Sequence, residues 1–295
     1  MKVLVTGREG QLARCLVDRS TGLEGIELVA VGRPELDLEV PGSAARAVTD
    51  FSPDVVINAA AYTAVDQAED EAERAFRINA EAAGDVAAAA REAGAAVIQI
   101  STDYVFDGFS AEPYREDAAT HPLGVYGRSK LAGEEQVRAA NPDHLILRTA
   151  WVYSPFGRNF VKTMVAAAAT REELTVVSDQ IGNPTSALDL ADGILAVVDH
   201  WRLGSRTGLG EVYHLAGGGS TTWCGFAQAI MDECRALGLP AADVRPIQTE
   251  DWPTKAVRPR NSMLDCMKFA RDFSFTMPQW RASLPAVVER IAGQG

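Results

Sequence analysis

Tyr126 and Lys130 are the residues of this 295-residue chain whose types and spacing most directly suggest catalysis. They lie four positions apart at the start of a helical pattern that continues through residues 129–135, and positions i and i+4 share one helix face. A phenol with a pKa of about 10 is a weak acid–base catalyst at neutral pH, and a neighbouring ammonium lowers that pKa by favouring the phenolate. A tyrosine tuned in this way can give a proton to a carbonyl oxygen while hydride reaches the carbonyl carbon.

Taken alone, a Y-x-x-x-K pattern is more often a surface tyrosine beside a solvated lysine, so the elements around it decide. An apolar run at residues 95–100 predicts a buried parallel strand. It ends in Ser101, Thr102 and Asp103, as a strand does when it leads into an active-site crevice.

The N-terminus predicts a strand, a glycine turn and a helix. A short apolar run leads directly into Gly7 and Gly10, and Leu12 and Leu16 then follow at helical spacing. Glycines here permit a tight turn and let backbone N–H groups approach a pyrophosphate at the helix N-terminus. Ala13 takes the third small position of this turn, which still allows close packing of helix and strand. This context predicts dinucleotide binding.

Several motifs follow one another along the chain and together resemble one family. They are G-x-x-G-Q-L at 7–12, N-A-A-A-Y-T-A-V-D at 58–66, S-T-D-Y-V-F-D-G at 101–108, Y-G-x-S-K at 126–130, R-T-A-W-V-Y at 148–153, D-Q-x-G-x-P-T at 179–185 and R-P-x-N-S at 258–262. In this order the chain resembles the dTDP-4-dehydrorhamnose reductases, which are extended members of the short-chain dehydrogenase/reductase superfamily. The resemblance covers nearly the whole chain.

The spacing of apolar runs predicts an α/β fold. Further strands are expected at residues 25–31, 54–58 and 144–149, with helices at 43–51 and within 66–94. Such alternation predicts a doubly wound, Rossmann-like parallel sheet. We expect a dinucleotide-binding domain at 1–150, to which 186–216 returns. Residues 151–185 and 217–295 are expected to form a smaller mixed substrate-binding subdomain.

The second strand ends at Gly32 and Arg33 without a carboxylate, and an arginine there accommodates the 2′-phosphate of NADPH. We therefore expect NADPH, with NADH possible. The resemblance implies that Asp37 and Leu38 contact adenine and that Ala61, Tyr62 and Thr63 flank the dinucleotide. The full set expected at the cofactor is Gly7, Gly10, Gln11, Leu12, Arg33, Asp37, Leu38, Ala61, Tyr62, Thr63, Tyr126 and Lys130.

The resemblance implies reduction of the 4-keto group of a dTDP-4-keto-6-deoxy sugar, from dTDP-4-dehydrorhamnose to dTDP-rhamnose or a close analogue. Tyr126 would donate the proton, Lys130 would lower the tyrosine pKa and hold the nicotinamide ribose, and Thr102 would bind the substrate carbonyl. Further substrate contacts are expected from Asp103, Tyr104, Trp151, Asn159, Lys162, Arg258 and Asn261.

Two alternatives share this fold. A sugar-nucleotide dehydratase carries Thr-Asp-Glu at the substrate face, whereas this chain has Thr102-Asp103-Tyr104. An epimerase, which turns over without net oxidation, stays open. A non-catalytic NADP-binding regulatory subunit is the other alternative, but Thr102, Tyr126 and Lys130 are all present.

Composition narrows the possible partners. The net charge of −12 disfavours nucleic acid and anionic membranes, and it requires local cations at an anionic ligand. Candidates for these cations are Arg33, Lys130, Lys162, Arg258 and Arg260. No apolar stretch is long enough to span a membrane and the N-terminus lacks a signal-peptide pattern, so we expect a cytoplasmic protein.

The cysteines and histidines show no metal-binding spacing. Some relatives are dimers bridged by a metal on glutamates, but Cys15 and Leu188 occupy the corresponding positions, and neither is an oxygen ligand for a hard cation. We therefore expect no metal and a monomer.

Overall fold

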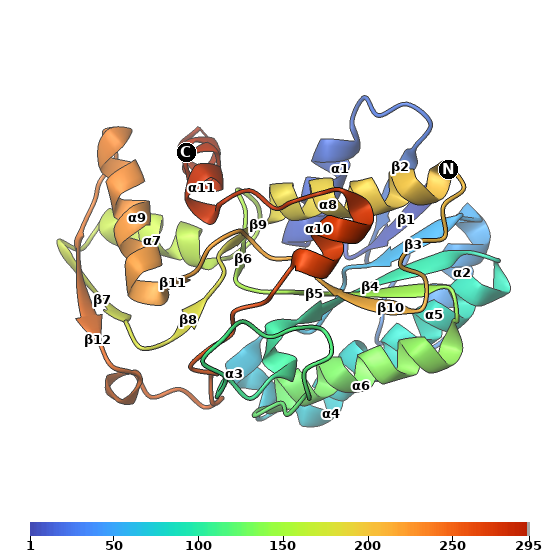
Figure 1. Ribbon diagram of the computed structural model, residues 1–295, viewed down its shortest axis with the longest axis horizontal. Coiled ribbons are helices and arrows are strands. Elements are labelled where there is room, and N and C mark those ends of the chain that lie inside the picture. Colours follow the sequence, from blue (N-terminus) through green and yellow to red (C-terminus); the bar gives the residue numbers. More distant parts are fainter. Residues whose placement is uncertain (294–295) are drawn as a thin grey trace.

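A six-stranded parallel sheet forms the centre of the molecule (Figure 1). The computed structural model describes residues 1–293. Along the sheet the order is β10-β5-β4-β3-β1-β2, and every neighbouring pair is parallel. The strands are β1 (Lys2–Thr6), β2 (Glu27–Val31), β3 (Val55–Asn58), β4 (Ala96–Thr102), β5 (His144–Thr149) and β10 (Glu211–His214). This confirms the doubly wound α/β fold. Its strand order reverses at β1 and β3, where such sheets bind ligands beyond the carboxyl ends of the strands.

Helices cover both faces of the sheet because successive strand side chains point to opposite sides. Val3 and Val5 of β1 pack in one core cluster, whereas Leu4 between them packs in another. The helices are α1 (Gln11–Ser20) and α8 (Ala187–Arg202) on one face, and α2 (Ser43–Phe51), α5 (Ala82–Glu92) and α6 (Val125–Ala140) on the other (Figure 1).

The alanine-rich segment before β4 folds as a broken helix. Its pieces are α3 (Val65–Ala68), α4 (Ala72–Phe76), the π-helical turn η1 (Arg77–Glu81) and α5. Asn79 in this turn accepts a hydrogen bond from the Tyr62 amide at 2.8 Å and donates one to the Ser129 hydroxyl at 3.0 Å. The turn therefore ties the segment after β3 to the helix that carries Tyr126.

A second lobe follows β5 and lies on the left of Figure 1. It contains α7 (Phe160–Ala168), α9 (Trp223–Ala236), α11 (Trp280–Ala292) and the parallel pair β7 (Glu173–Val177) and β12 (Asp243–Ile247). The helix α10 (Met267–Phe273) instead packs against β10 and α8 of the sheet (Figure 1). Short pairs join β6 (Val152–Tyr153) to β9 (Thr185–Ser186), and β8 (Ile181–Gly182) to β11 (Thr221–Thr222). The sequence did not predict β12, whose side chains are all partly or fully exposed and which contains Pro246. The division into two domains stays a prediction.

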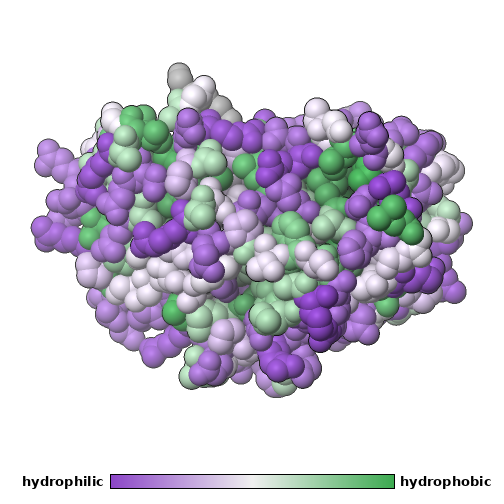
Figure 2. Space-filling model, turned by 45° about the horizontal axis from the view of Figure 1, so that its top comes forward, coloured by the Kyte–Doolittle hydropathy of each residue, from purple (hydrophilic) through white to green (hydrophobic). Residues whose placement is uncertain are grey.

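Polar and charged side chains cover most of the face shown in Figure 2, and apolar residues form scattered patches. Within residues 1–293, no helix combines the length and apolar character that a membrane crossing requires.

Candidate active site

A cavity of about 910 Å³ opens at the carboxyl ends of β1, β3, β4 and β5. It brings together most of the residues expected to bind cofactor or substrate. Those that line it are Gly7, Gly10, Gln11, Leu12, Arg33, Asp37, Leu38, Ala61, Thr63, Thr102, Asp103, Tyr104, Tyr126, Lys130 and Trp151. Tyr62, Asn159, Lys162, Arg258 and Asn261 do not belong to this lining.

The glycine turn after β1 has the geometry that a dinucleotide requires. Gly7 has a φ of +87°, and a Cβ atom placed on it would lie 3.1 Å from the Cα of Ala60, beyond β3. The Gly10 amide donates to the Gly7 carbonyl at 2.7 Å, and α1 begins at the next residue. Because Gly10 has no side chain to cap α1, the first amides of the helix are available to an anion. The residues present therefore fit the diphosphate of a dinucleotide.

Tyr126 lines the same cavity, together with Thr102 and Tyr104. Its ring packs edge-on against Tyr104, with centroids 5.5 Å apart. Burial, and then the charge of Asp103, raise its pKa to about 12, while a hydrogen bond with the Thr102 hydroxyl partly offsets this rise. The expectation of a lowered tyrosine pKa was therefore wrong for the protein alone. At neutral pH Tyr126 keeps its proton.

Lys130 does not lower the Tyr126 pKa as expected, because its ammonium is engaged elsewhere. Its Nζ atom donates to the Ile100 carbonyl at 2.6 Å, so the ammonium is bound to the end of β4. The side chain is almost fully buried, and burial lowers its pKa to about 8, against a smaller opposing effect of Glu134. Lys130 therefore titrates close to physiological pH.

A buried ion pair lies behind this lysine, and the sequence analysis did not find it. Glu134 and Arg148 join through two hydrogen bonds of 2.8 and 2.7 Å, and Glu134 also accepts one from the Ser101 hydroxyl at 2.6 Å. These residues fix α6 against the ends of β4 and β5. The position of Glu134 one helical turn after Lys130 is the signal that sequence offers for it.

Asp103 is buried, and only one of its carboxylate oxygens has a clear partner. Oδ1 accepts from the Thr102 hydroxyl at 2.8 Å, whereas Oδ2 has no hydrogen bond of ordinary geometry within residues 1–293. Burial raises the Asp103 pKa to about 7, and the Thr102 and Ser262 hydroxyls act in the opposite direction. A buried carboxylate oxygen without a hydrogen bond disfavours the charged form of Asp103, in agreement with its raised pKa.

Trp151 is held in an unusual backbone conformation at the end of β5, with a φ of +46°. Its indole stacks on Trp223 from α9, with centroids 3.6 Å apart and an interplanar angle of 8°, and its Nε1 donates to the Ser262 hydroxyl at 3.0 Å. Both tryptophans line the cavity. Trp223 is a cavity residue that was not predicted, because it lies on α9 and only the tertiary fold brings it next to Trp151.

Three of the predicted residues outside the lining have structural roles near the cavity. Tyr62 is buried, and its hydroxyl donates to Glu71 at 3.3 Å. Asn159 caps α7 by accepting from the Lys162 amide, and its amide group donates to Gln11 at 3.0 Å. Lys162 donates through Nζ to the Pro155 carbonyl at 3.2 Å.

Arg258 and Asn261 lie in an irregular segment that precedes α10. Arg258 binds both carboxylate oxygens of Asp66, at 3.1 and 2.7 Å. Asn261 donates to the carbonyls of Ser110 and Glu112 at 2.8 and 3.1 Å. Both side chains therefore brace loops outside the cavity lining, and Arg258 also lies close to Tyr104, which belongs to that lining.

The adenosine end of the cavity contains a second arginine besides Arg33. Arg8 lies within the glycine turn, packs against Gly32 and forms a 3.3 Å ion pair with Glu35. Arg8 was not among the predicted cations, although its position between Gly7 and Gly10 is visible in the sequence.

No metal ligand set occurs among residues 1–293: no group of three or more histidine, cysteine, aspartate or glutamate side chains is placed to hold an ion. Cys15 and Leu188 are both buried, and burial raises the Cys15 pKa to about 12.

Comparisons with known proteins agree with the geometry of the cavity. A family model described as the RmlD substrate binding domain matches residues 1–292. A dTDP-4-dehydrorhamnose reductase of Sinorhizobium fredii is 41% identical over 295 residues, which is 100% of this chain and 99% of the relative. A solved dTDP-4-dehydrorhamnose reductase of Clostridium acetobutylicum has 38% identity and a TM-score of 0.90, with 99% of this chain and 100% of that chain covered. Another, from Bacillus anthracis and in complex with NADP, has 35% identity and a TM-score of 0.87, with 100% and 99% covered.

Proposed function

The chain belongs to the dTDP-4-dehydrorhamnose reductase family, and from this premise we propose how its cavity performs the reduction. The enzyme is an NADPH-dependent oxidoreductase that reduces the 4-keto group of a dTDP-4-keto-6-deoxy sugar. One observation carries this assignment: the glycine turn at Gly7 and the residue Tyr126 line the same cavity.

Tyr126 acts as the proton donor. Its raised pKa keeps the phenol protonated at neutral pH, which is the form that a donor to a developing alkoxide requires. NADPH, when held in this cavity, would supply the hydride. Thr102 lies beside the phenol, and rotation of its hydroxyl away from Asp103 lets it donate to the same carbonyl oxygen. Two donors at one oxygen polarise the ketone and fix its orientation.

Lys130 holds a positive charge behind the reacting centre. Its Nζ uses one donor on Ile100, which leaves further N–H groups for the ribose hydroxyls of the cofactor. The positive charge would stabilise the phenolate that forms when Tyr126 donates its proton.

The sugar binds between Asp103 and Trp151. Asp103 and Trp151 both line the cavity, where the carboxyl group contacts a sugar hydroxyl and the indole packs on the sugar ring. Tyr104, which also lines the cavity, contributes a further contact. Arg258 supports this end indirectly, because its pair with Asp66 fixes the segment that carries Ser262.

The test is the stoichiometry of NADPH oxidation with a dTDP-4-keto-6-deoxyhexose. We expect one NADPH to be consumed per sugar reduced. Turnover of the sugar without net oxidation would identify an epimerase, and binding of NADPH without turnover of any keto sugar would identify a regulatory subunit. The monomeric state and the cytoplasmic location stay predictions from the sequence, and light scattering on the purified protein tests the first.

A further inference from the structure

The cavity has no excess of positive charge to offer its anionic ligands. Its lining contains four cationic residues and four acidic ones: Arg8, Arg33, Lys130 and Arg158, against Glu9, Asp37, Glu39 and Asp103. The chain as a whole carries a net charge of −12. Where an anion can bind therefore depends on the position of each cation and on whether that cation is already paired with another group of the protein.

Two of these cations are already bound to other groups of the protein, and a third lies away from the diphosphate site. Arg8 is paired with Glu35, and Lys130 is bound to the Ile100 carbonyl at the catalytic end. Arg33 follows β2, where the adenosine end of a dinucleotide lies. Arg158, like Arg33, is exposed and forms no ion pair with any residue of the range 1–293, but its loop is bonded to the first residue of α1.

The loop that carries Arg158 is fixed against the start of α1. Gln11, the first residue of that helix, accepts hydrogen bonds from the Ser154 hydroxyl at 2.9 Å and from the Asn159 amide at 3.0 Å. A Cβ atom on Gly157 would lie 3.2 Å from Cγ of the same glutamine. Gly157 therefore packs against the first residue of α1, and Arg158 is the next residue in the loop. The N-terminus of this helix faces the diphosphate site.

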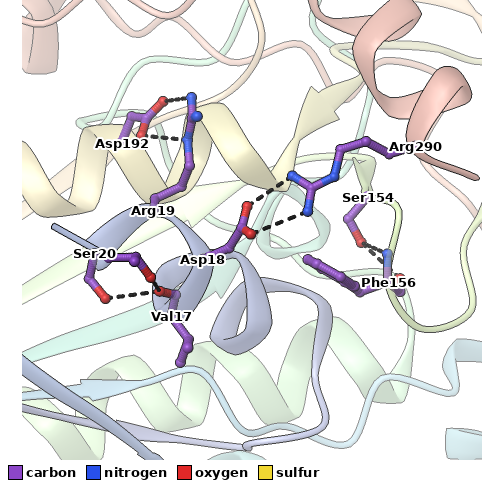
Figure 3. A network of polar contacts seen from close by, with 9 residues as sticks. Val17, Asp18, Arg19, Ser20, Ser154, Phe156, Asp192 and Arg290 are labelled. Carbon is purple, nitrogen blue, oxygen red and sulfur yellow. Dashed lines mark hydrogen bonds and ion pairs between the residues drawn. The ribbon is translucent and has the colours of Figure 1, made fainter. Parts of the chain in front are cut away.

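A second set of contacts holds the outer side of this loop (Figure 3). The Phe156 ring lies between two guanidinium groups, with Arg14 at 4.2 Å and Arg290 at 5.3 Å from its centroid. Arg290, on α11, is itself fixed by two hydrogen bonds to Asp18 of α1, at 2.8 and 3.3 Å. Helices from both lobes thus set the position of the loop, while the Arg158 side chain is left free.

We propose that Arg158 binds the diphosphate of the dinucleotide, as a side-chain cation opposite the helix amides of α1. The sequence analysis selected Lys162 for such a role, but that ammonium is used by the Pro155 carbonyl within the same loop. A guanidinium suits a diphosphate because it donates two parallel hydrogen bonds to phosphate oxygens. This assignment rests on the proposed function, since it takes NADPH as the ligand of the cavity.

The test measures binding, so it is independent of turnover. Equilibrium titration of the full chain with NADPH, NADH and dTDP compares the wild type with Arg158→Gln, Arg158→Lys and Arg171→Gln. Arg171 is an exposed arginine outside the cavity, so its variant removes the same charge from the molecule. We expect Arg158→Gln to weaken NADPH and NADH equally, by about tenfold, because both carry the diphosphate. Arg158→Lys should recover most of the affinity, and Arg171→Gln should match the wild type within about twofold.

Each other result overturns the assignment. A loss for dTDP alone would place Arg158 on the diphosphate of the sugar nucleotide. A loss for NADPH but not NADH would place it on the 2′-phosphate, and an equal loss in Arg171→Gln would reduce the effect to net charge. If the proposed function fails but both dinucleotides bind as expected, the role of Arg158 in dinucleotide binding stands.

Discussion

The Nζ atom of Lys130 lies 2.6 Å from the carbonyl oxygen of Ile100, which fixes the ammonium to the strand that leads into Thr102. Strand β4 therefore positions both groups: the Ile100 carbonyl binds the Lys130 ammonium, and Thr102, two residues later, carries the hydroxyl beside the substrate carbonyl. Tyr126 stands one helical turn before Lys130 on α6. The catalytic groups therefore keep their relative positions as long as β4 and α6 remain packed.

Lys130 predicts a loss of activity at alkaline pH. Burial lowers its pKa to about 8, so the positive charge behind the phenol disappears as the pH rises through that value. We expect kcat/KM to fall by about tenfold per pH unit above this pKa, and Lys130→Met to have low activity without this decline. A pH profile of both proteins measures it. An unchanged decline in the methionine variant would assign it to another group.

The same lysine predicts a stability effect of definite sign. Its pKa is near 8 when folded and 10.5 in the reference state, so the unfolded chain binds more protons between these values. The contribution of Lys130 to the free energy of unfolding therefore rises with pH across that window. Denaturant titrations at pH 8 and pH 10 should show that this rise is smaller in Lys130→Met. Identical differences in the two proteins would contradict the buried, shifted ammonium.

We expect the contribution of Asp103 to stability to fall as the pH rises, over a lower pH range than that of Lys130. Its pKa is about 7 when folded and 3.8 in the reference state, so the folded chain binds more protons between these values. Stability from this group is complete below the lower value and is lost as the pH rises to about 7. We expect Asp103→Asn to melt higher than the wild type at pH 8, by about 3 °C, and to gain less at pH 5.

That variant should also bind the sugar less well. An amide replaces one acceptor oxygen, so we expect KM for the keto sugar to rise by about tenfold while the affinity for NADPH is unchanged. Steady-state kinetics measure the first quantity and fluorescence titration the second. Loss of NADPH affinity would show that the substitution disturbs the fold rather than the sugar contact.

We expect Arg33 to make the enzyme prefer NADPH over NADH. It lines the cavity just beyond β2, where a 2′-phosphate is bound in folds of this type. We expect Arg33→Ala to raise KM for NADPH by about tenfold and to leave KM for NADH within about twofold. Equal effects on both cofactors would contradict a contact with the 2′-phosphate.

The part of the site that lies at strand ends could be predicted from the sequence. Gly7, Thr102 and Asp103 each follow a recognisable strand, and parallel strands bring their carboxyl ends to one edge of the sheet. Tyr126 and Lys130 were predictable because helix geometry fixes their spacing.

The residues contributed by the second lobe could not be predicted in this way. Arg158 and Lys162 are four apart and both cationic, and only the tertiary contacts show that one is free and the other is used by its own loop. Arg258 was expected at the diphosphate, but its partner Asp66 lies 192 residues away in the sequence. The tyrosine pKa was also predicted with the wrong sign, because the extent of burial is a property of the fold.

The most direct test of the account is the turnover number of Tyr126→Phe with NADPH and a dTDP-4-keto-6-deoxyhexose. Removal of the phenolic hydroxyl leaves the ring packed against Tyr104 and removes the proton donor. We expect the kcat of Tyr126→Phe to fall by at least about a hundredfold, while its affinity for NADPH stays within about twofold of the wild type. A kcat close to that of the wild type would show that the proton comes from another group.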